Sequence, residues 1–492
     1  MTIDTITTQL YINGHARQAT DGGTYPLHNP ARPSELVGHV AAGTESDVDD
    51  AVRAAHSAFP SWSALSYAER AAQLNRVADL LVGNEAEVEA RSRLFTREHG
   101  KIRRETLLEI TRLGDRFRQT AGYAERLAKD ETIPGPPFDA IVTRQPRGVA
   151  VLVVPWNWPL AIVGAKLPQA LMAGNTVVVK PSENAALAPT ITLHMIAAAL
   201  PPGVVNIVTG DSTRIGDRLT GHPLTRFVNF TGSVAIGRHV MKVAAENLTP
   251  VTLELGGNDP GIVLEDAVLD EAAFTRLYMG AFMSTGQICM ALKRLYVHRS
   301  RYDEVVAGIT AVANKQVVGD GLLPETTMGP LNNPKQLAVV RTMIAEARAA
   351  GADVQEFGQV PDTELYQAGY FQRPTFVFNA DPKLRVVREE QFGPVLPIMA
   401  FDAEAEVIAA ANDSEFGLCS SVWTADRDRA VAVARQLEAG FTYLNAHGPA
   451  AQDGRSPFGG FKHSGIGRNM GYEGVTQFQG HHAISGPAGW LF

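Results

Sequence analysis

The sequence predicts an α/β protein with two doubly wound α/β domains. From Gly148 onward, short apolar runs alternate with stretches of helical periodicity, a pattern typical of a parallel sheet covered by helices on both faces. The preceding stretch, from Asp47 to about Lys129, has apolar residues at helical spacing and a capping-box match at Ser66 and Glu69. The length of 492 residues allows two or three domains, at about 100 to 200 residues each.

The expected strands fall into two groups. The first sheet is predicted from residues 149–154, 176–179, 204–208, 226–230 and 251–255. After Gly261 the second is predicted from strands near residues 294–298, 374–378, 396–401, 418–423 and 441–445, with helices around 302–314, 334–350 and 427–439. Between the helical region and the first sheet, the prolines from Pro134 to Pro137 break the helical pattern. The segment up to Pro146 therefore predicts an arm that reaches outward.

The composition is that of an ordinary globular protein, and it excludes several functions. The net charge of −8 and the pI of about 5.9 offer no basic surface for nucleic acid. Two cysteines cannot form a disulfide framework, and no long apolar run predicts a membrane helix. The first five residues are neither basic nor apolar. A cytoplasmic protein with no metal, nucleic-acid or membrane partner is expected.

A cysteine and a glutamate carry the strongest chemical signal. Cys289 ends the run Ser-Thr-Gly-Gln-Ile-Cys, and Glu254 precedes it in Leu-Glu-Leu-Gly-Gly. Covalent oxidation of an aldehyde requires a thiolate as the nucleophile and, in a later step, a carboxylate as the base. Taken singly, a free cysteine is more often a small buried hydrophobe, and a lone glutamate is more often paired or solvated. The motifs described below favour the catalytic interpretation of both residues over the structural one.

A phosphate-binding segment is predicted where a strand leads into a helix. No G-x-G-x-x-G fingerprint follows any predicted strand, so an ordinary Rossmann phosphate site is not supported. In Phe230-Thr231-Gly232-Ser233, free backbone N–H groups and the positive end of the helix dipole could meet an anion. The alternative is that Ser233 is an ordinary N-cap after a glycine turn.

Two motifs lie at the ends of predicted strands. Lys180 and Glu183 follow residues 176–179, at the edge where open α/β sheets bind ligands, and could contact ribose hydroxyls. Alternatively, Ser182 or Glu183 caps the next helix at a solvated strand end. Asn157 lies in Pro-Trp-Asn-Trp-Pro, a rigid turn that could aim its amide at a developing oxyanion or could simply cap a core.

Two later motifs are less specific. Glu390 and Phe392 precede a Gly-Pro turn, and the alternative for them is a solvated acidic loop. Residues 457–465 form a glycine-rich segment that could pass for a phosphate loop. That interpretation is disfavoured because no helix N-terminus or strand is clearly attached to the segment.

Together these motifs resemble those of the aldehyde dehydrogenase superfamily. The resemblance extends from Tyr11-Ile12-Asn13-Gly14 to Gly471-Tyr472-Glu473-Gly474. It implies that Cys289 is the nucleophile, Glu254 the general base and Asn157 part of the oxyanion hole. It also implies three parts: a cofactor domain, expected at residues 1–128 and 147–257, a catalytic domain at 258–456, and an oligomerisation arm with a C-terminal tail at 129–146 and 457–492. A homodimer or homotetramer is expected.

The resemblance also implies the cofactor contacts. They are Lys180 and Glu183 at the adenosine ribose, Gly232 and Ser233 at the pyrophosphate, Glu390 and Phe392 at the nicotinamide end, and Val154, Pro155, Trp156, Ser182, Gly210, Phe230 and Leu255 beside them. The cofactor is NAD(P). NAD is expected to be preferred over NADP, because Glu183 would accept from the 2′-hydroxyl and repel a 2′-phosphate.

A mostly apolar substrate tunnel is implied as well. Its expected residues are Trp158, Ile162, Ala165, Met283, Ile288, Met290, Gln452 and Phe458. Family members that act on short anionic semialdehydes often have an arginine where this chain has Met283. Medium-length aliphatic or aromatic aldehydes are therefore expected over acetaldehyde and succinic semialdehyde, since each buried methylene gains about 0.8 kcal/mol.

Two positions depart from the family pattern. Asn258 stands where lysine is common, and Asn469 stands where glutamate commonly follows Gly-Arg. Neither residue is expected to contact the reacting groups. The two departures put in doubt which subfamily the chain belongs to and one contact near the subunit interface. Cys419 has none of the neighbours of Cys289 and is expected to be a buried structural residue.

The expected reaction is NAD(P)-dependent oxidation of an aldehyde to the carboxylic acid, through a cysteine thiohemiacetal and thioester. One alternative is a CoA-acylating semialdehyde dehydrogenase, which needs no hydrolytic base, so that Glu254 argues against it. A second is a non-catalytic structural or binding protein on the same fold, which would be free to lose the nucleophile or base. A cysteine hydrolase is weaker, because no Cys-His signature is present.

Overall fold

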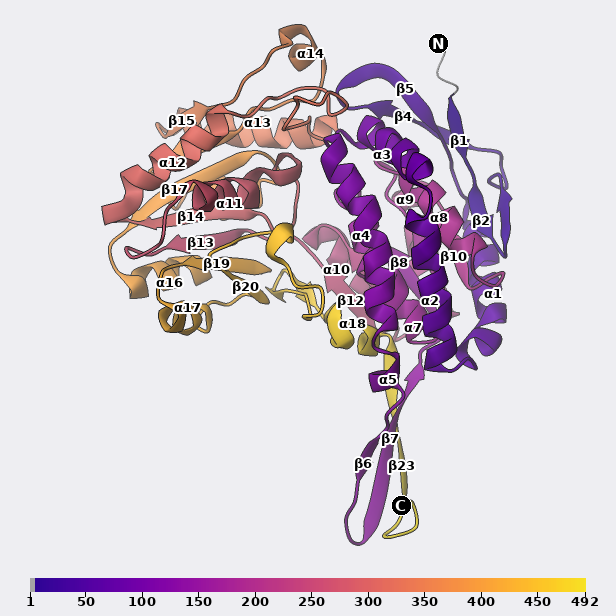
Figure 1. Ribbon diagram of the computed structural model, residues 1–492. Coiled ribbons are helices and arrows are strands. Elements are labelled where there is room, and N and C mark those ends of the chain that lie inside the picture. Colours follow the sequence, from indigo (N-terminus) through magenta and orange to yellow (C-terminus); the bar gives the residue numbers. More distant parts are fainter. Residues whose placement is uncertain (1–4) are drawn as a thin grey trace.

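The chain forms two large sheets, each covered by helices, and a projecting arm (Figure 1). The computed structural model describes residues 5–492; residues 1–4, which belong to the N-terminal segment for which no targeting signal is expected, lie outside the described residues. The predicted α/β class with two doubly wound sheets is confirmed.

The first sheet has eight strands in the order β22-β12-β11-β8-β9-β10-β2-β3. Its central strands run parallel and are β8 (Val149–Val153), β9 (Thr176–Lys180), β10 (Val205–Ile207), β11 (Thr225–Thr231) and β12 (Val251–Glu254). Antiparallel edge strands are β2 (Leu10–Ile12), β3 (His15–Arg17) and β22 (Gly465–Ile466). The central strands agree with the prediction. The edge strands escaped it because two or three residues carry too little periodicity.

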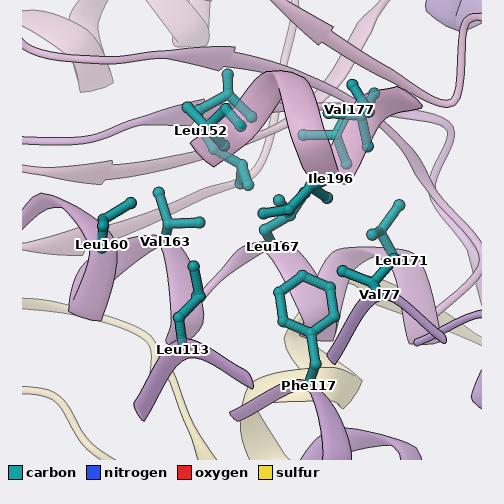
Figure 2. Packing of buried hydrophobic residues seen from close by; sticks show 14 of the residues in the cluster. Val77, Leu113, Phe117, Leu152, Leu160, Val163, Leu167, Leu171, Val177 and Ile196 are labelled. Atoms are coloured by element: carbon teal, nitrogen blue, oxygen red, sulfur yellow. The ribbon is translucent and has the colours of Figure 1, made fainter. Parts of the chain in front are cut away.

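Helices cover both faces of this sheet. They are α1 (Glu45–Ser63), α2 (Tyr67–Val82), α3 (Glu85–His99), α4 (Arg103–Ala121), α5 (Ala124–Leu127), α6 (Pro159–Gly164), α7 (Leu167–Met172), α8 (Ala188–Ala198), α9 (Ser212–Thr220), α10 (Val234–Ala245) and α18 (Gly471–Gln477). The predicted capping box of Ser66 and Glu69 opens α2. Figure 2 shows Leu113 and Phe117 of α4 pointing toward Val163 in α6 and Leu167 in α7. This packing fixes α4 against the turn that precedes α6.

The second sheet has seven strands in the order β15-β16-β17-β14-β13-β19-β20. They are β13 (Asp259–Val263), β14 (Leu292–His298), β15 (Asp353–Glu356), β16 (Thr375–Phe378), β17 (Val395–Phe401), β19 (Cys419–Trp423) and β20 (Phe441–Leu444). Its helices are α11 (Glu271–Phe282), α12 (Tyr302–Asn314), α13 (Pro334–Ala349), α14 (Thr363–Ala368), α15 (Arg385–Arg388), α16 (Glu404–Asn412) and α17 (Arg427–Ala434). The helix predicted to reach residue 439 ends at Ala434, where tighter turns follow.

The arm joins segments that are far apart in the sequence. β7 (Phe138–Pro146) pairs with β6 (Glu131–Ile133) and with β23 (Gln479–Pro487), and the three strands project away from both sheets (Figure 1). Smaller sheets are formed by β1 (Ile6–Thr8), β4 (Thr24–Asn29) and β5 (Arg32–Ala41), and by β18 (Phe416–Gly417) and β21 (Phe461–Lys462). Among residues 5–492, no helix is long and apolar enough to cross a membrane, and no histidine, cysteine and carboxylate side chains cluster as metal ligands.

Candidate active site

The loop before Cys289 has an unusual backbone that buried side chains hold in place. After α11 comes a short 3-10 turn, η1 (Met283–Gly286), in which Ser284 and Thr285 have φ angles of 51° and 59°. Such left-handed conformations are strained for residues other than glycine and are typical of functional sites. The Ser284 N–H donates to Glu105 Oε1 of α4 at 2.9 Å, and Thr285 Oγ1 donates to the Gly329 carbonyl at 2.9 Å. These bonds fix the position of the half-buried Cys289.

The Pro-Trp turn is anchored by the same helix. Glu109 of α4 accepts from the backbone N–H groups of Leu160 and Ala161 at 2.6 and 3.0 Å, at the start of α6. Asn157, immediately before this helix, is buried and donates through Nδ2 to the Gln287 carbonyl at 3.0 Å. Its amide therefore lies beside the loop that carries Cys289, and one of its two N–H groups is available to a ligand.

Glu254 ends β12 and lies in a pocket that favours its neutral form. Its side chain is buried, and Oε1 has no hydrogen-bond partner within residues 5–492. Burial raises the pKa of Glu254 to about 7, although the positive charge of Lys166 and the amide of Asn469 act to lower it. Burial likewise lowers the pKa of Lys166 to about 7. A carboxyl group that changes charge near neutral pH is suited to general base catalysis.

The expectation that Asn469 does not touch the chemistry is wrong. Asn469 lines the same cavity as Glu254 and Cys289. Its Oδ1 accepts from Asn229 Nδ2 at 2.6 Å, and Asn229 Oδ1 accepts from Lys166. The C-terminal segment reaches the site because β22 pairs with β12, a contact that spacing along the sequence does not reveal. Asn258, by contrast, is an internal residue: it is buried and donates to the Val387 carbonyl at 2.8 Å.

The glycine-rich segment makes this approach possible. Gly465 has a φ of +144°, and a Cβ there would collide with the Leu253 carbonyl of β12. The Leu255 N–H donates to the Ser464 carbonyl at 2.9 Å. The end of the segment 457–465 is thus bonded to the first sheet through Ser464 and Gly465, whereas Phe461–Lys462 pairs with β18. Short strands are therefore attached to this segment, contrary to the expectation from the sequence.

Two cavities meet at Cys289. Asn157, Thr231 and Cys289 line both of them. Glu254 belongs to the larger cavity, which encloses about 860 Å³ including its open end. Cys289 is therefore reachable from two sides, through two differently built cavities.

The larger cavity contains most of the predicted tunnel. The predicted residues that line it are Trp158, Ile162, Ala165, Ile288, Met290, Gln452 and Phe458. Met283 does not line it but packs with Trp158 and Ile288 in an adjoining apolar cluster. The lining residues that sequence reasoning missed are Glu109, Arg112, Leu113, Arg116, Ala161, Lys166, Thr231, Pro449, Asn469 and Met470. Four of these come from α4, which no motif marks in the sequence.

The smaller cavity contains the central part of the predicted cofactor set. Its lining consists of Pro155, Trp156, Asn157, Thr231, Gly232, Ser233, Leu255, Gly256, Cys289, Gln336, Val339, Glu390 and Phe392. Ser233 Oγ accepts from the Ile236 N–H at 3.4 Å and so caps α10, whose N-terminus faces this cavity. The N-cap interpretation of Ser233 is confirmed. Anion binding there stays a prediction that the cap is compatible with, since an N-cap is also where a helix meets an anion.

Glu390 and Phe392 form one wall of the smaller cavity. Glu390 Oε1 accepts from the Gly257 N–H at 3.0 Å, and burial raises the pKa of Glu390 to about 7. A Cβ at Gly256 would lie 2.5 Å from Glu390 Oε2, which explains the glycine. The rings of Trp156 and Phe392 meet edge to face with centroids 5.6 Å apart. The loop that carries Glu390 and Phe392 is therefore folded into the cavity wall and is not a solvated acidic loop at these two residues.

The remaining predicted cofactor residues lie outside this cavity. They are Val154, Lys180, Ser182, Glu183, Gly210 and Phe230. At the end of β9, Lys180 Nζ lies 3.3 Å from Glu183 Oε2 and donates to Ser212 Oγ at 2.8 Å. Ser212 Oγ donates in turn to Glu183 at 3.0 Å. A lysine, a serine and a half-exposed carboxylate thus form one polar cluster at the carboxyl edge of the sheet.

The two cysteines are neighbours with different surroundings. Burial raises the pKa of the Cys289 thiol, and the negative charges of Glu254 and Glu390 raise it further. Cys419, at the start of β19, is 1% exposed and belongs to an apolar cluster against which Cys289 packs. Cys419 lines neither of the two cavities. Of the two thiols, Cys289 is the one that faces both cavities.

Comparisons with known proteins define the class. The model of the aldehyde dehydrogenase family matches residues 17–484, so the chain belongs to that family. It is 38% identical to glutarate-semialdehyde dehydrogenase of Pseudomonas putida, over 96% of both chains. It is also 38% identical to geranial dehydrogenase of Castellaniella defragrans, over 92% of this chain and 94% of the other. The crystal structure of betaine aldehyde dehydrogenase from Staphylococcus aureus in complex with NAD+ superposes with a TM-score of 0.91 at 32% identity, over 98% of this chain and 95% of that one. The protein is an NAD(P)-dependent aldehyde dehydrogenase.

Proposed function

We propose that Cys289 is the nucleophile that takes the aldehyde through the larger cavity while the cofactor occupies the smaller one. The observation that carries this proposal is that Cys289 and Asn157 border both cavities. The Cys289 sulfur would bond to the carbonyl carbon, and the resulting oxyanion would accept from the free N–H of Asn157 and from the Cys289 backbone N–H. Because burial favours the neutral thiol, its proton must pass to a base as the bond forms.

Glu254 would act as the base in hydrolysis. The cofactor, when bound, supplies the hydride acceptor that turns the thiohemiacetal into a thioester. A water molecule between Glu254 and the thioester would give a proton to the carboxylate and bond to the acyl carbon, and the Cys289 thiolate would leave. The buried position of Glu254, which lines the same cavity as Cys289, supports this role.

The smaller cavity fits a nicotinamide dinucleotide. The N-terminus of α10, which begins after Ser233, faces this cavity and would meet a pyrophosphate there. Phe392 and Glu390 would hold the nicotinamide end, and Pro155, Trp156 and Leu255 would form the walls, with Val154 and Phe230 on the strands beside them.

NAD is the proposed preferred cofactor. At the ribose end, Glu183 would accept from the 2′-hydroxyl, with Lys180, Ser182 and Gly210 beside it. The Lys180 charge is already paired with Glu183, so a 2′-phosphate would meet a carboxylate and no free cation in this cluster.

The proposed substrates are aldehydes with a medium-length aliphatic or aromatic body. Trp158, Ile162, Ile288 and Phe458 make the inner part of the larger cavity apolar, and Ala165 leaves space. The names of the relatives do not select a substrate, since one is a semialdehyde dehydrogenase and another a geranial dehydrogenase. The apolar wall is the reason for the choice.

The assembly is also proposed. The exposed arm of β6, β7 and β23 offers strand edges for a second copy, so we expect a homodimer or homotetramer in the cytoplasm. The domain limits at residues 128, 147, 257 and 456 remain a prediction. In the structure, β22 joins the first sheet and α18 packs on α4 and α7, whereas β23 pairs with β7 of the arm.

The experiment is oxidation of hexanal, benzaldehyde, acetaldehyde and succinic semialdehyde with NAD or NADP, followed by the absorbance of the reduced cofactor. We expect the highest kcat/KM for the first two aldehydes with NAD, and the free carboxylic acid as product with no need for coenzyme A. A clear advantage of acetaldehyde or succinic semialdehyde would contradict the apolar-tunnel proposal, and a requirement for coenzyme A would contradict hydrolysis.

A further inference from the structure

Two arginines of α4 lie at the larger cavity and have no part in the proposed chemistry. Arg112 and Arg116 are one helical turn apart and both line the cavity that holds Cys289. Arg112 is exposed, and Arg116 is half-buried. Two like charges four residues apart on a helix are mutually destabilising, by about 0.2 to 0.5 kcal/mol in isolated helices. The fold therefore maintains two neighbouring positive charges in a cavity whose exposed lining is mostly apolar.

Neither arginine is neutralised by the protein. Within residues 5–492, no hydrogen bond or ion pair involves Arg112, and the one hydrogen bond of Arg116 goes to the neutral Gln119 amide, at 3.0 Å. Burial lowers the pKa of Arg116, and the charge of Arg112 lowers it further, while the charges of Asp115 and Asp453 act in the opposite direction. Guanidinium groups with free donors are well suited to bind a carboxylate with two parallel hydrogen bonds.

The carboxylates around the arginines are bound elsewhere. Glu109, the one acidic residue of α4 that lines the cavity, forms an ion pair with Lys101 and caps α6. Asp453 forms an ion pair with Arg455 at 2.7 Å, and Asp115 lies 3.8 Å from Arg118. None of these carboxylates forms a hydrogen bond or an ion pair with Arg112 or Arg116, so the two guanidinium groups keep free donors for an acceptor from outside the protein.

The position of Arg116 is built into the fold. A Cβ at Gly164 of α6 would lie 3.1 Å from Arg116 Cγ, and a Cβ at Gly454 would overlap the Arg116 guanidinium. Two glycines thus leave a slot through which the side chain runs to the cavity. A guanidinium held in place loses less entropy when it binds an anion than a freely mobile one.

We propose that Arg112 and Arg116 form an anion subsite at the outer end of the substrate cavity, and that the preferred substrates are aldehydes with an apolar body and a terminal carboxylate. The inference rests on the proposed function, because Cys289 fixes the aldehyde end. The wall formed by Trp158 and Ile288, with Met283 packed against them, offers no cation to a short semialdehyde. Lys166, the remaining cation of the lining, donates to Asn229. A longer chain places its carboxylate at the arginines and its methylenes along Trp158 and Ile162. A terminal carboxylate should therefore lower kcat/KM for short aldehydes and raise it for long ones.

The test compares ω-carboxyaldehydes, from succinic semialdehyde upward, with unbranched alkanals of matched length. We expect the alkanal to have the higher kcat/KM among the short pairs and the carboxyaldehyde among the long pairs. In Arg112→Met and Arg116→Met, the advantage of the long carboxyaldehydes should fall about tenfold to 100-fold through KM, the worth of a lost charge-assisted hydrogen bond. The measured quantity is the ratio of kcat/KM between the two aldehydes of each matched pair, in which a general change of the cavity cancels.

The control is Arg118→Met, which removes an exposed arginine of the same helix that pairs with Asp79. This variant should keep the preference of the unmodified enzyme. Arg112→Met also guards against misfolding, because that side chain is exposed. Alkanals that remain better at every length, or a carboxylate preference that survives loss of both arginines, would overturn the subsite. Failure to oxidise any aldehyde would instead count against the proposed function.

Discussion

The two cavities that meet at Cys289 are built in opposite ways. The smaller one is formed by segments at the carboxyl ends of β8, β11 and β12 together with the Glu390 loop. Each of these carries a recognisable motif. The larger one combines α4, α6, the loop of Cys289 and the C-terminal segment, and most of its lining is apolar and unremarkable in the sequence. On the proposed assignment, cofactor binding rests mainly on local motifs, whereas substrate recognition rests on long-range packing.

The largest effect expected from this comparison is at the junction itself. Cys289→Ala should abolish aldehyde oxidation and leave NAD binding intact, because the thiol forms the covalent bond while the cofactor contacts lie on other motifs. Activity and NAD affinity, by fluorescence titration, are the measurements. Cys419→Ala is the matched control and should be nearly silent. Turnover that persists in the first variant, or disappears only in the second, would show that the wrong cysteine is assigned.

The next effect is at the base. Glu254→Gln should reduce steady-state turnover by roughly 100-fold to 10,000-fold, the usual worth of a general base. An initial burst of reduced cofactor should remain if acylation needs the base less than hydrolysis does. Stopped-flow absorbance separates the two phases. Unchanged steady-state turnover would remove Glu254 from the mechanism.

The pH dependence follows from the burial of Glu254. Its pKa is raised to about 7, so the carboxylate is ionised and able to accept a proton only above that pH. Turnover limited by hydrolysis should rise as the pH passes through about 7 and then level off. Asn469→Asp would place a second negative charge beside Glu254, raise its pKa and move the rising part of the profile to higher pH. Asn469→Ala, which adds no charge but removes the amide that lowers the pKa of Glu254, should lower turnover by about tenfold through a lost buried hydrogen bond and move the profile in the same direction by less than Asn469→Asp does. The same profile in Asn469→Asp as in the unmodified enzyme would contradict the contact between the two residues.

The smallest expected effect is at the far end of the cofactor. Glu183→Ala should reduce the preference for NAD over NADP by roughly tenfold, because the repulsive carboxylate is gone and Lys180 becomes free to meet a 2′-phosphate. The ratio of kcat/KM for the two cofactors is the measurement. Glu246→Ala, at an exposed position near the end of α10, is a control of equal charge change. A ratio that does not change in Glu183→Ala would exclude the proposed role.

The same contrast explains what the sequence could predict. The parallel strands were visible because buried strands are short apolar runs, and Cys289, Glu254 and Asn157 stand in local motifs. Asn469 and Arg116 could not be placed in the same way. Asn469 reaches Glu254 only because β22 adds to the edge of the first sheet, and Arg116 reaches the cavity only through the packing of α4 on α6. The spacing of Arg112 and Arg116 indicates that they share one face of a helix, but no local pattern indicates that this face borders the cavity.

The most direct test of the central claim is to trap the acyl-enzyme. Glu254→Gln mixed with NAD and an aldehyde that the unmodified enzyme oxidises, quenched within the burst and digested, should yield one peptide heavier by the acyl group. The account predicts that this acyl group is on Cys289, and that the adduct is absent from Cys289→Ala and from a reaction without NAD. A burst of reduced cofactor with no adduct on Cys289, or an adduct on Cys419, would contradict the claim that Cys289, at the junction of the two cavities, is the nucleophile.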